Sequence, residues 1–189
     1  MHAAPNLVLV GSMGSGKSSI GKRLADRFGL RFVDADREIE TRAGTTVTMM
    51  FECEGEAGFR ARERATLAEL MADAGTVIAT GGGAVLDADT RTLLRARGYV
   101  VHLHVSVEQQ IERLARDRTR PLLAGDDRET VLRQLAIVRE PLYAATAHLC
   151  FDTDALSSIE AATKLGHLLQ THWPFDNASA RVTTPEAGT

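Results

Sequence analysis

The sequence is poor in aromatic residues and has no excess of positive charge. Aromatic side chains make up 5% of the 189 residues, which argues against a surface that stacks nucleic-acid bases. The formal net charge is −3, so no general attraction to DNA, RNA or an anionic membrane is expected. No segment reaches the roughly 20 apolar residues that cross a bilayer, and the short run 7–10 lacks the basic flank of a signal peptide. We therefore expect a soluble cytoplasmic protein.

Cysteine is also scarce, and the histidines form no metal-binding motif. Cys53 and Cys150 are the two cysteines, and they lie far apart in the chain, so reduced thiols are expected. His102 and His104 lie two apart in an apparent strand and so share a face, but no third ligand is close to them in the sequence. The sequence therefore does not favour a catalytic or metal-binding role for this pair.

What the chain does contain is an alternation of short apolar runs and longer helical patterns. The predicted strands are 7–10, 31–33, 76–79, 100–105 and 148–151. The predicted helices are 17–28, 59–72, 88–97, 107–116, 129–145 and 156–169. This alternation predicts an α/β fold with a parallel sheet covered on both faces. The length suits one domain over residues 1–170, followed by a disordered tail at 171–189, although Trp173 and Phe175 could pack back on the body.

The first strand is followed by a phosphate-binding loop. Residues 11–18 read GSMGSGKS, which matches the pattern GxxxxGK[ST] between a strand and a helix. Glycines let the backbone wrap around phosphate oxygens, and the next helix points the positive end of its dipole at them. Lys17 would reach the β and γ phosphates, and the Ser18 hydroxyl would bind Mg²⁺. The predicted nucleotide-binding residues here are Gly14, Ser15, Gly16, Lys17, Ser18 and Ser19.

Two carboxylates follow the second predicted strand. Asp34 and Asp36 lie two apart, so in a strand they would point the same way, into the crevice at the carboxyl ends of the strands. One could hold Mg²⁺ through water, and the other could orient a substrate hydroxyl. The alternative is an aspartate that caps a helix before Arg37, and the position after a phosphate loop favours function.

Further along, an arginine, a glycine triplet and a basic segment could complete a site for an anionic substrate. Arg60 and Glu63 share a helix face, so the pair is either a held fork for a substrate carboxylate or a plain surface ion pair. The triplet 81–83 follows a strand and permits close approach of its backbone to a ligand. The residues of interest are Gly81, Gly82, Gly83, Arg113, Arg120 and Arg139.

The basic segment at about 112–126 has the composition of a mobile lid over phosphates. Arg120 there could neutralise charge on the transferred phosphoryl group, whereas Arg116 and Arg118 are better explained as a solvated face. Arg139 precedes Pro141, which is expected to interrupt or kink the helical pattern, and it could supply a second cation to the substrate.

In this order and spacing, the motifs resemble those of the shikimate kinase family over roughly residues 5–170. The resemblance implies a three-layer P-loop kinase fold, similar to nucleoside monophosphate kinases, with a five-stranded parallel sheet in the order 2-3-1-4-5. It also implies transfer of the γ-phosphoryl group of ATP to the 3-hydroxyl of shikimate, in aromatic amino-acid biosynthesis, with Mg²⁺ as cofactor. We expect the chain to be a monomer that binds neither nucleic acid nor a membrane.

The resemblance also implies a role for each motif residue. Shikimate is expected to bind Asp36, Arg60, Arg139 and the backbone of 81–83. Ser18 and Asp34 are expected to serve Mg²⁺, Asp34 through water. Lys17 and Arg120 are expected to stabilise the phosphates, and Arg113 to stack on adenine. Asp36, Lys17 and Arg120 are the expected catalytic residues.

Two other readings compete with this one. Another small-molecule kinase, for gluconate or AMP, would share the phosphate loop, but the arginines and Asp36 suit a hydroxylated acid better than a nucleobase. A P-loop binding module without catalysis would be expected to lack Lys17, Asp36 or the basic lid residue, and the sequence keeps all of them.

Overall fold

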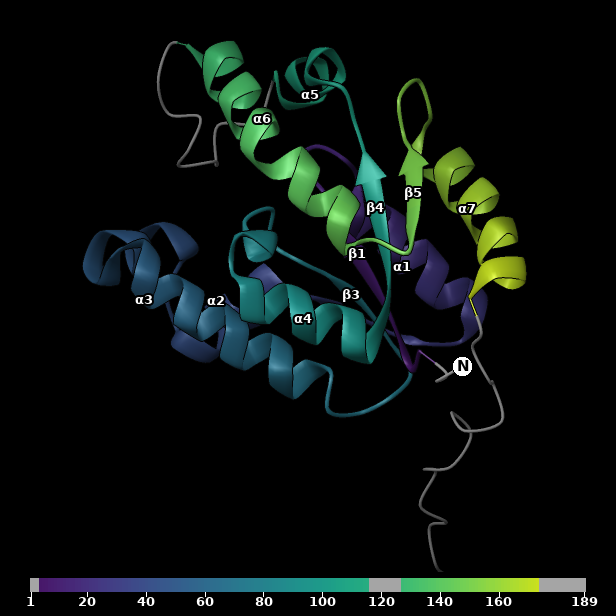
Figure 1. The fold of residues 1–189 in the computed structure, drawn as a ribbon, viewed down its shortest axis with the longest axis horizontal. Coiled ribbons are helices and arrows are strands. Elements are labelled where there is room, and N and C mark those ends of the chain that lie inside the picture. The colour runs from purple at the N-terminus through teal and green to yellow at the C-terminus, as the bar shows by residue number, and fades with distance from the viewer. Residues whose placement is uncertain (1–3, 116–126, 174–189) are drawn as a thin grey trace, which may run out of the picture.

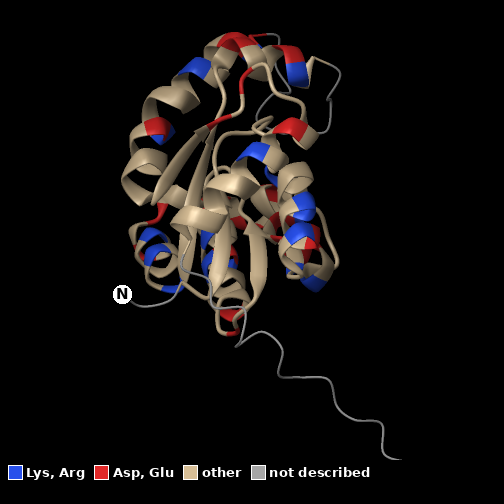
Figure 2. Cartoon of the chain, turned by 90° about the vertical axis from the view of Figure 1, so that its right-hand side faces the viewer, with Lys and Arg blue, Asp and Glu red and all other residues tan. Residues whose placement is uncertain are grey.

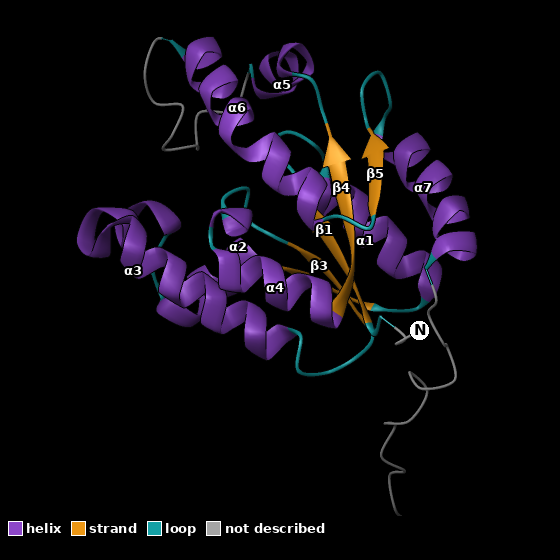
Figure 3. Ribbon diagram, viewed as in Figure 1, coloured by secondary structure: helices purple, strands orange, loops and turns teal. Residues whose placement is uncertain are grey.

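A computed structural model describes residues 4–115 and 127–173, and they form one parallel sheet with helices on both faces (Figures 1 and 3). The strand order is β2-β3-β1-β4-β5, and every pairing is parallel. The strands are β1 (Asn6–Val10), β2 (Arg31–Asp34), β3 (Thr76–Ala79), β4 (Gly98–His104) and β5 (Leu149–Asp152). The predicted strand order is therefore confirmed.

Helices connect the strands and bring each of them back parallel to the last. They are α1 (Lys17–Phe28), α2 (Ala35–Ala43), α3 (Val47–Leu70), the short 3₁₀ helix η1 (Ala84–Leu86), α4 (Ala88–Arg97), α5 (Val107–Leu114), α6 (Arg128–Thr146) and α7 (Ser158–His172). The bounds predicted for α1 and α4 match those of the structure. Both helices have clear signals at their ends, since Gly29 follows α1 in a left-handed conformation and Asp87 caps α4.

The central strand β1 divides the core into two halves. Leu7 and Leu9 face the layer of α1 and α7, whereas Val8 and Val10 face the layer of α3, α4 and α6. All four residues are fully buried. A strand with both faces covered reads as a continuous apolar run, which is why the sequence shows no alternation here.

Two features of the β2–β3 connection differ from the sequence prediction. Helix α2 was not predicted, because its first residues were interpreted as the end of the second strand. Helix α3 begins before the predicted residue 59, and it is interrupted at Gly55, whose φ of 70° and ψ of −179° are not helical. This break separates the first part of α3, from Val47 to Glu54, from the part that carries Arg60.

The end of the described chain largely follows the prediction. Helix α6 spans Arg128–Thr146, which matches the predicted helix 129–145 to within one residue at each end, and it continues through Pro141. Helix α7 continues to His172, and Trp173 is buried against the Phe28 ring, with ring centroids 5.7 Å apart. The packed body therefore reaches residue 173, three residues beyond the predicted boundary. The rest of the predicted tail lies outside the described residues.

The surface carries charge of both signs. Figure 2 shows acidic and basic residues interspersed on the helices, while the strands between them are largely uncharged. Within residues 4–115 and 127–173, no helix combines the length and apolarity needed to span a bilayer.

Candidate active site

The phosphate loop connects β1 to α1 and leaves the start of that helix open to an anion. Gly16 precedes α1 with a φ of 89°, a conformation that favours glycine, and no side chain caps the helix there. The first amides of α1 are therefore available to phosphate oxygens. The Lys17 ammonium donates to the carbonyls of Gly11 at 2.7 Å and Ser12 at 2.9 Å, which places its charge across the loop.

Ser18, the last residue of the phosphate-loop motif and the second residue of α1, contacts the end of β2. The Ser18 hydroxyl donates to the Asp34 carboxylate at 2.5 Å. Asp34 also caps α2, since its side chain accepts a 3.4 Å hydrogen bond from the Arg37 amide. The capping role weighed for this motif is thus correct for Asp34, and it does not remove the carboxylate from the site.

Asp36 reaches the same site by a different route from the one predicted. It lies in the first turn of α2 and not in a strand, so the argument that the two aspartates share a strand face is wrong. Both nevertheless line one cavity, because α2 starts at the carboxyl end of the sheet beside the phosphate loop.

This cavity, of about 680 Å³, joins the phosphate loop to the predicted acceptor residues. Its walls come from the loop, from α2 and α3, from the turn after β3 and from α6. The lining residues include Gly14, Gly16, Lys17, Ser18, Ser19, Asp34, Asp36, Phe51, Phe59, Arg60, Glu63, Gly81, Gly82, Gly83, Leu114 and Arg139. Its size is in the usual range for small-molecule sites.

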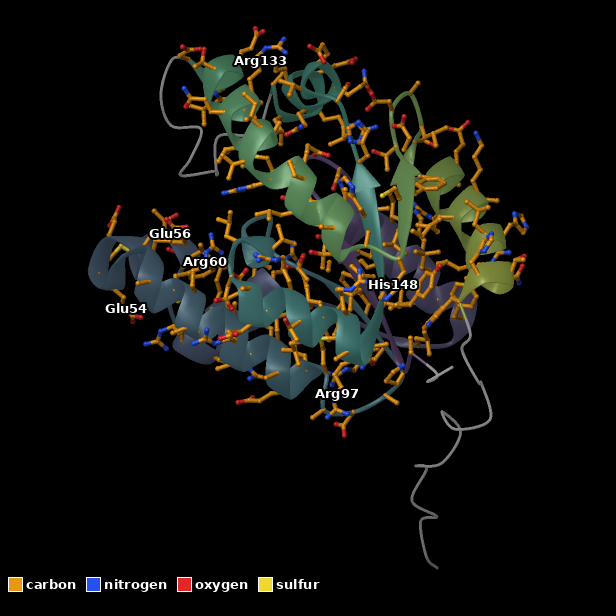
Figure 4. The ribbon with its side chains drawn as sticks, viewed as in Figure 1. Glu54, Glu56, Arg60, Arg97, Arg133 and His148 are labelled. Atoms are coloured by element: carbon orange, nitrogen blue, oxygen red, sulfur yellow. The ribbon has the colours of Figure 1, made fainter. Side chains whose placement is uncertain are left out.

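Arg60 is held in this cavity by carboxylates and aromatic rings. Its guanidinium donates to Glu63 at 2.6 Å and to Glu56 at 3.3 Å, and Figure 4 labels Arg60 beside Glu56 on α3. The same group lies over the Phe59 ring at 5.4 Å and the Phe51 ring at 5.9 Å from the centroids. The Arg60 side chain is only 17% exposed, so it is not part of a plain surface ion pair.

Glu63 is the buried member of this group, and its role was underestimated from the sequence. It is 2% exposed, and burial raises the pKa of its carboxyl, an effect that Arg60 opposes and the nearby Asp36 strengthens. Glu63 Oε1 and Arg60 Nε are buried and have no hydrogen-bond partner among the described residues. Two polar atoms without partners at a cavity wall are suited to a polar ligand.

The glycine triplet allows these side chains to approach the backbone. A Cβ at Gly81 would lie 2.6 Å from both Asp36 Oδ1 and Glu63 Oε1, and one at Gly83 would lie 2.0 Å from Arg60 Nη2. The atoms that come close to this backbone are the protein's own acidic and basic groups, and close approach to a ligand stays a prediction. Only glycine fits at positions 81 and 83 without moving the side chains of Asp36, Glu63 or Arg60.

Helix α6 supplies the opposite wall. Arg139 is 6% exposed and lines the cavity. One turn further on, the Tyr143 hydroxyl donates to the carbonyl of Gly82 at 2.5 Å, and burial raises the pKa of this tyrosine to about 12. Tyr143 is thus a neutral donor that fixes the glycine turn, a role that spacing along the chain does not reveal.

The two remaining residues predicted to bind the nucleotide are Arg113, which the structure describes, and Arg120, which it does not. Arg113, near the end of α5, donates to the carbonyl of Gly14 at 3.0 Å and to the Thr153 hydroxyl at 3.1 Å, so it bridges the phosphate loop and the loop after β5. Arg120 and the predicted lid residues from 116 onward lie outside the described residues.

The fold and this site together define a P-loop phosphotransferase with an acceptor pocket for a small polar anion. Comparison with known proteins agrees. The shikimate kinase family model matches residues 13–170. Shikimate kinase of Stenotrophomonas maltophilia (strain R551-3) is 50% identical over 180 residues, covering 95% of this chain and 100% of that protein. The corresponding protein of Xanthomonas axonopodis pv. citri is 53% identical over 180 residues, with the same coverage.

Solved structures lead to the same family. Shikimate kinase from Acinetobacter baumannii, in complex with shikimate, superposes with a TM-score of 0.84 at 41% identity, covering 95% of this chain and 96% of that one. The chain belongs to the shikimate kinase family. It is an ATP-dependent kinase with the P-loop kinase fold.

Proposed function

We propose that the protein transfers the γ-phosphoryl group of ATP to the 3-hydroxyl of shikimate, giving shikimate 3-phosphate and ADP. The observation that carries this proposal is the cavity that places Lys17 and Ser18 at one side and Asp36, Arg60 and Arg139 at the other. Phosphoryl transfer requires positioning and charge neutralisation more than covalent catalysis, and this arrangement provides both.

The nucleotide half of the proposal rests on the phosphate loop. The backbone of 14–19 and the start of α1 would surround the phosphates, with Lys17 exchanging its loop carbonyls for phosphate oxygens. Arg113 lies beside Gly14 and the loop after β5, where its planar guanidinium could stack on adenine. Arg120 would stabilise the transferred group from the segment outside the described residues.

The residues of the loop and β2 also fit a magnesium ion. Ser18 and Asp34 present a hydroxyl and a carboxylate oxygen 2.5 Å apart, both at the cavity wall, and oxygen donors of this type are what Mg²⁺ prefers. When bound, Mg²⁺ would neutralise phosphate charge. Ser18 would hold the ion directly, and Asp34 would hold it through water.

The acceptor half matches the chemistry of shikimate, which carries one carboxylate and three hydroxyls. Arg60 and Arg139 are two guanidinium forks for the carboxylate. Asp36 would accept hydrogen bonds from the hydroxyls and orient the attacking oxygen, taking up its proton as the new bond forms. The backbone of 81–83, fixed by Tyr143, would provide further hydrogen bonds close to the substrate.

We also propose that the protein acts as a monomer in the cytoplasm, where ATP is available. Size-exclusion chromatography with light scattering checks the monomer, and a mass of two chains would contradict it.

The direct experiment is to measure ADP release from Mg-ATP by the purified chain with shikimate, gluconate, AMP or no acceptor. Release that depends on shikimate alone is expected, with one ADP formed for each shikimate 3-phosphate. Release with gluconate or AMP, but not with shikimate, would leave the nucleotide site in place and refute the acceptor assignment. ATP binding without release for any acceptor would instead favour a non-catalytic module.

A further inference from the structure

A cluster of two histidines and a glutamate lies outside the lining of the active-site cavity. His102 and His104 are on β4, and Glu140 is on α6, which packs across that strand (Figure 1). The Glu140 carboxylate oxygen Oε2 lies 3.5 Å from His102 Nε2 and 3.3 Å from His104 Nδ1. One ligand atom from each of the three residues lies within 4.8 Å of the others.

Two of the separations are those expected between ligands of one metal ion. Four ligands at the 2.0–2.2 Å typical of Zn²⁺ stand about 3.3–3.6 Å apart at the edges of a tetrahedron. The distances from Glu140 Oε2 to His102 Nε2 and to His104 Nδ1 both lie in this range, and the shorter contact is also a long hydrogen bond. The three ligand atoms are therefore close enough together to share one ion.

His102 provides an independent indication. It is 3% exposed, and its Nε2 atom is buried without a hydrogen-bond partner in the described part of the chain. A buried polar atom of this kind is normally satisfied by protein, water or an ion.

We propose that His102, His104 and Glu140 bind a divalent transition-metal ion of the Zn²⁺ type, with a water molecule as the fourth ligand. Two imidazoles with one carboxylate are a donor set for Zn²⁺, whereas Mg²⁺ prefers oxygen ligands throughout. The site is therefore distinct in chemistry from the oxygen pair of Ser18 and Asp34.

The position of this site connects it to both substrates. Glu140 follows Arg139 directly, and His102 stacks on the Tyr143 ring, with centroids 5.0 Å apart. Tyr143 in turn fixes the carbonyl of Gly82. An ion here would hold α6 against β4, behind the wall that carries Arg139, and would add positive charge near Lys17.

The test is calorimetric titration of ZnCl₂ into the full chain, stripped with chelator and kept in millimolar Mg²⁺ without nucleotide. We expect one Zn²⁺ per chain at micromolar or lower Kd, and at least tenfold weaker binding in His104→Ala and Glu140→Gln. Both substitutions are at partly exposed side chains, 41% and 28%, so the variants should fold. His167→Ala, an exposed histidine on α7, is the matched control and should bind as the parent does.

A second titration separates this site from surface thiols. Cys53 and Cys150 are exposed, and Cys150 pairs in register with His102, so it projects from the same face of the sheet. The Cys53→Ser, Cys150→Ser double variant should keep the stoichiometric Zn²⁺ site. Co²⁺ should give the visible absorption of a four-coordinate site in this variant, and His104→Ala should remove it. Three results would overturn the proposal. They are loss of Zn²⁺ binding in the double cysteine variant, unchanged binding in His104→Ala and Glu140→Gln, and absence of binding in the parent protein.

Discussion

The Arg60 guanidinium donates a 2.6 Å hydrogen bond to Glu63, and the two neighbours of this arginine differ sharply in burial. The Glu63 side chain is 2% exposed, whereas that of Glu56, the other carboxylate on Arg60, is 62% exposed. A buried carboxylate holds its partner in one geometry, while an exposed ion pair contributes little. The orientation of Arg60 is therefore set by Glu63.

Glu63→Gln should raise the KM for shikimate at least tenfold while the KM for ATP changes less than about twofold. The amide keeps the size of the side chain but weakens the charge-assisted hydrogen bond that orients Arg60. Steady-state kinetics with each substrate varied in turn measure both constants. Glu56→Gln is the matched control and should change neither by more than about twofold; equal effects in the two variants would show that burial does not set the role of Glu63.

Asp36→Asn should lower kcat by about 100-fold or more and leave the Kd of Mg-ATP within about threefold of the parent value. The asparagine cannot take up the proton of the attacking hydroxyl, although it occupies the same place in the first turn of α2. Rapid-quench kinetics give the rate, and calorimetry gives the nucleotide affinity. An unchanged kcat would exclude Asp36 from the chemical step.

Gly83→Ala should raise the KM for shikimate at least tenfold, because a Cβ at that position would lie 2.0 Å from Arg60 Nη2 and push the guanidinium away. The backbone at Gly83 has a φ of −96°, which alanine adopts without strain, so the effect comes from this contact alone. Gly82→Ala is the control for folding, since its Cβ would lie 3.5 Å from Arg139 Nη1, an ordinary contact. Both variants should melt within a few degrees of the parent, and normal shikimate affinity in Gly83→Ala would contradict the packing argument.

Mild acid should destabilise the fold through His148. Burial and Arg95 lower the pKa of this histidine, and its Nδ1 accepts a 2.9 Å hydrogen bond from the Val100 amide. The unfolded chain therefore binds a proton near pH 6.5 that the folded chain resists, so stability is full above that pH and falls as the pH drops toward the folded pKa. Losing one hydrogen bond costs about 1 kcal/mol, equivalent to about 2–4 °C in Tm.

The matching variant is His148→Asn, which removes the titrating ring. Between about pH 7.5 and 5.5, the Tm of the parent should fall by about 2–4 °C more than that of the variant. Thermal unfolding followed by circular dichroism in both buffers measures this difference. The other histidines are the same in the two proteins, so their titration does not contribute to it. Equal losses in the two proteins would show that His148 does not contribute.

The sequence predicted the position of the phosphate loop because that motif is local, whereas the strand order was predicted only from the resemblance to the shikimate kinase family. It did not predict α2, since Asp34 serves at once as a strand end, a helix cap and the hydrogen-bond partner of Ser18. A single residue with three roles gives no separate signal for each. The helical segment that precedes residue 59 was not predicted, and its interruption at Gly55 gives no separate signal, because a glycine in the sequence does not reveal its φ.

Contacts between distant parts of the chain were the other limit. The burial of Glu63 depends on Gly81, and the Tyr143 hydrogen bond depends on Gly82, both of which come from other elements. The third member of the histidine cluster, Glu140, is supplied by α6, so a search for ligands close in sequence to His102 and His104 could not find it. Spacing predicts which residues share one element, and packing decides which elements meet.

The Trp173 indole donates a 3.0 Å hydrogen bond to the carbonyl of Ala4, so the two ends of the described chain are joined at the edge of the sheet opposite the cavity. Figure 1 places the N-terminal label beside the end of α7. This arrangement makes the domain suitable for circular permutation, because a short linker could join Ala4 to Trp173 without crossing the site. It also means that a surface tether attached through Ala4 or Trp173 would leave the mouth of the active site facing outward.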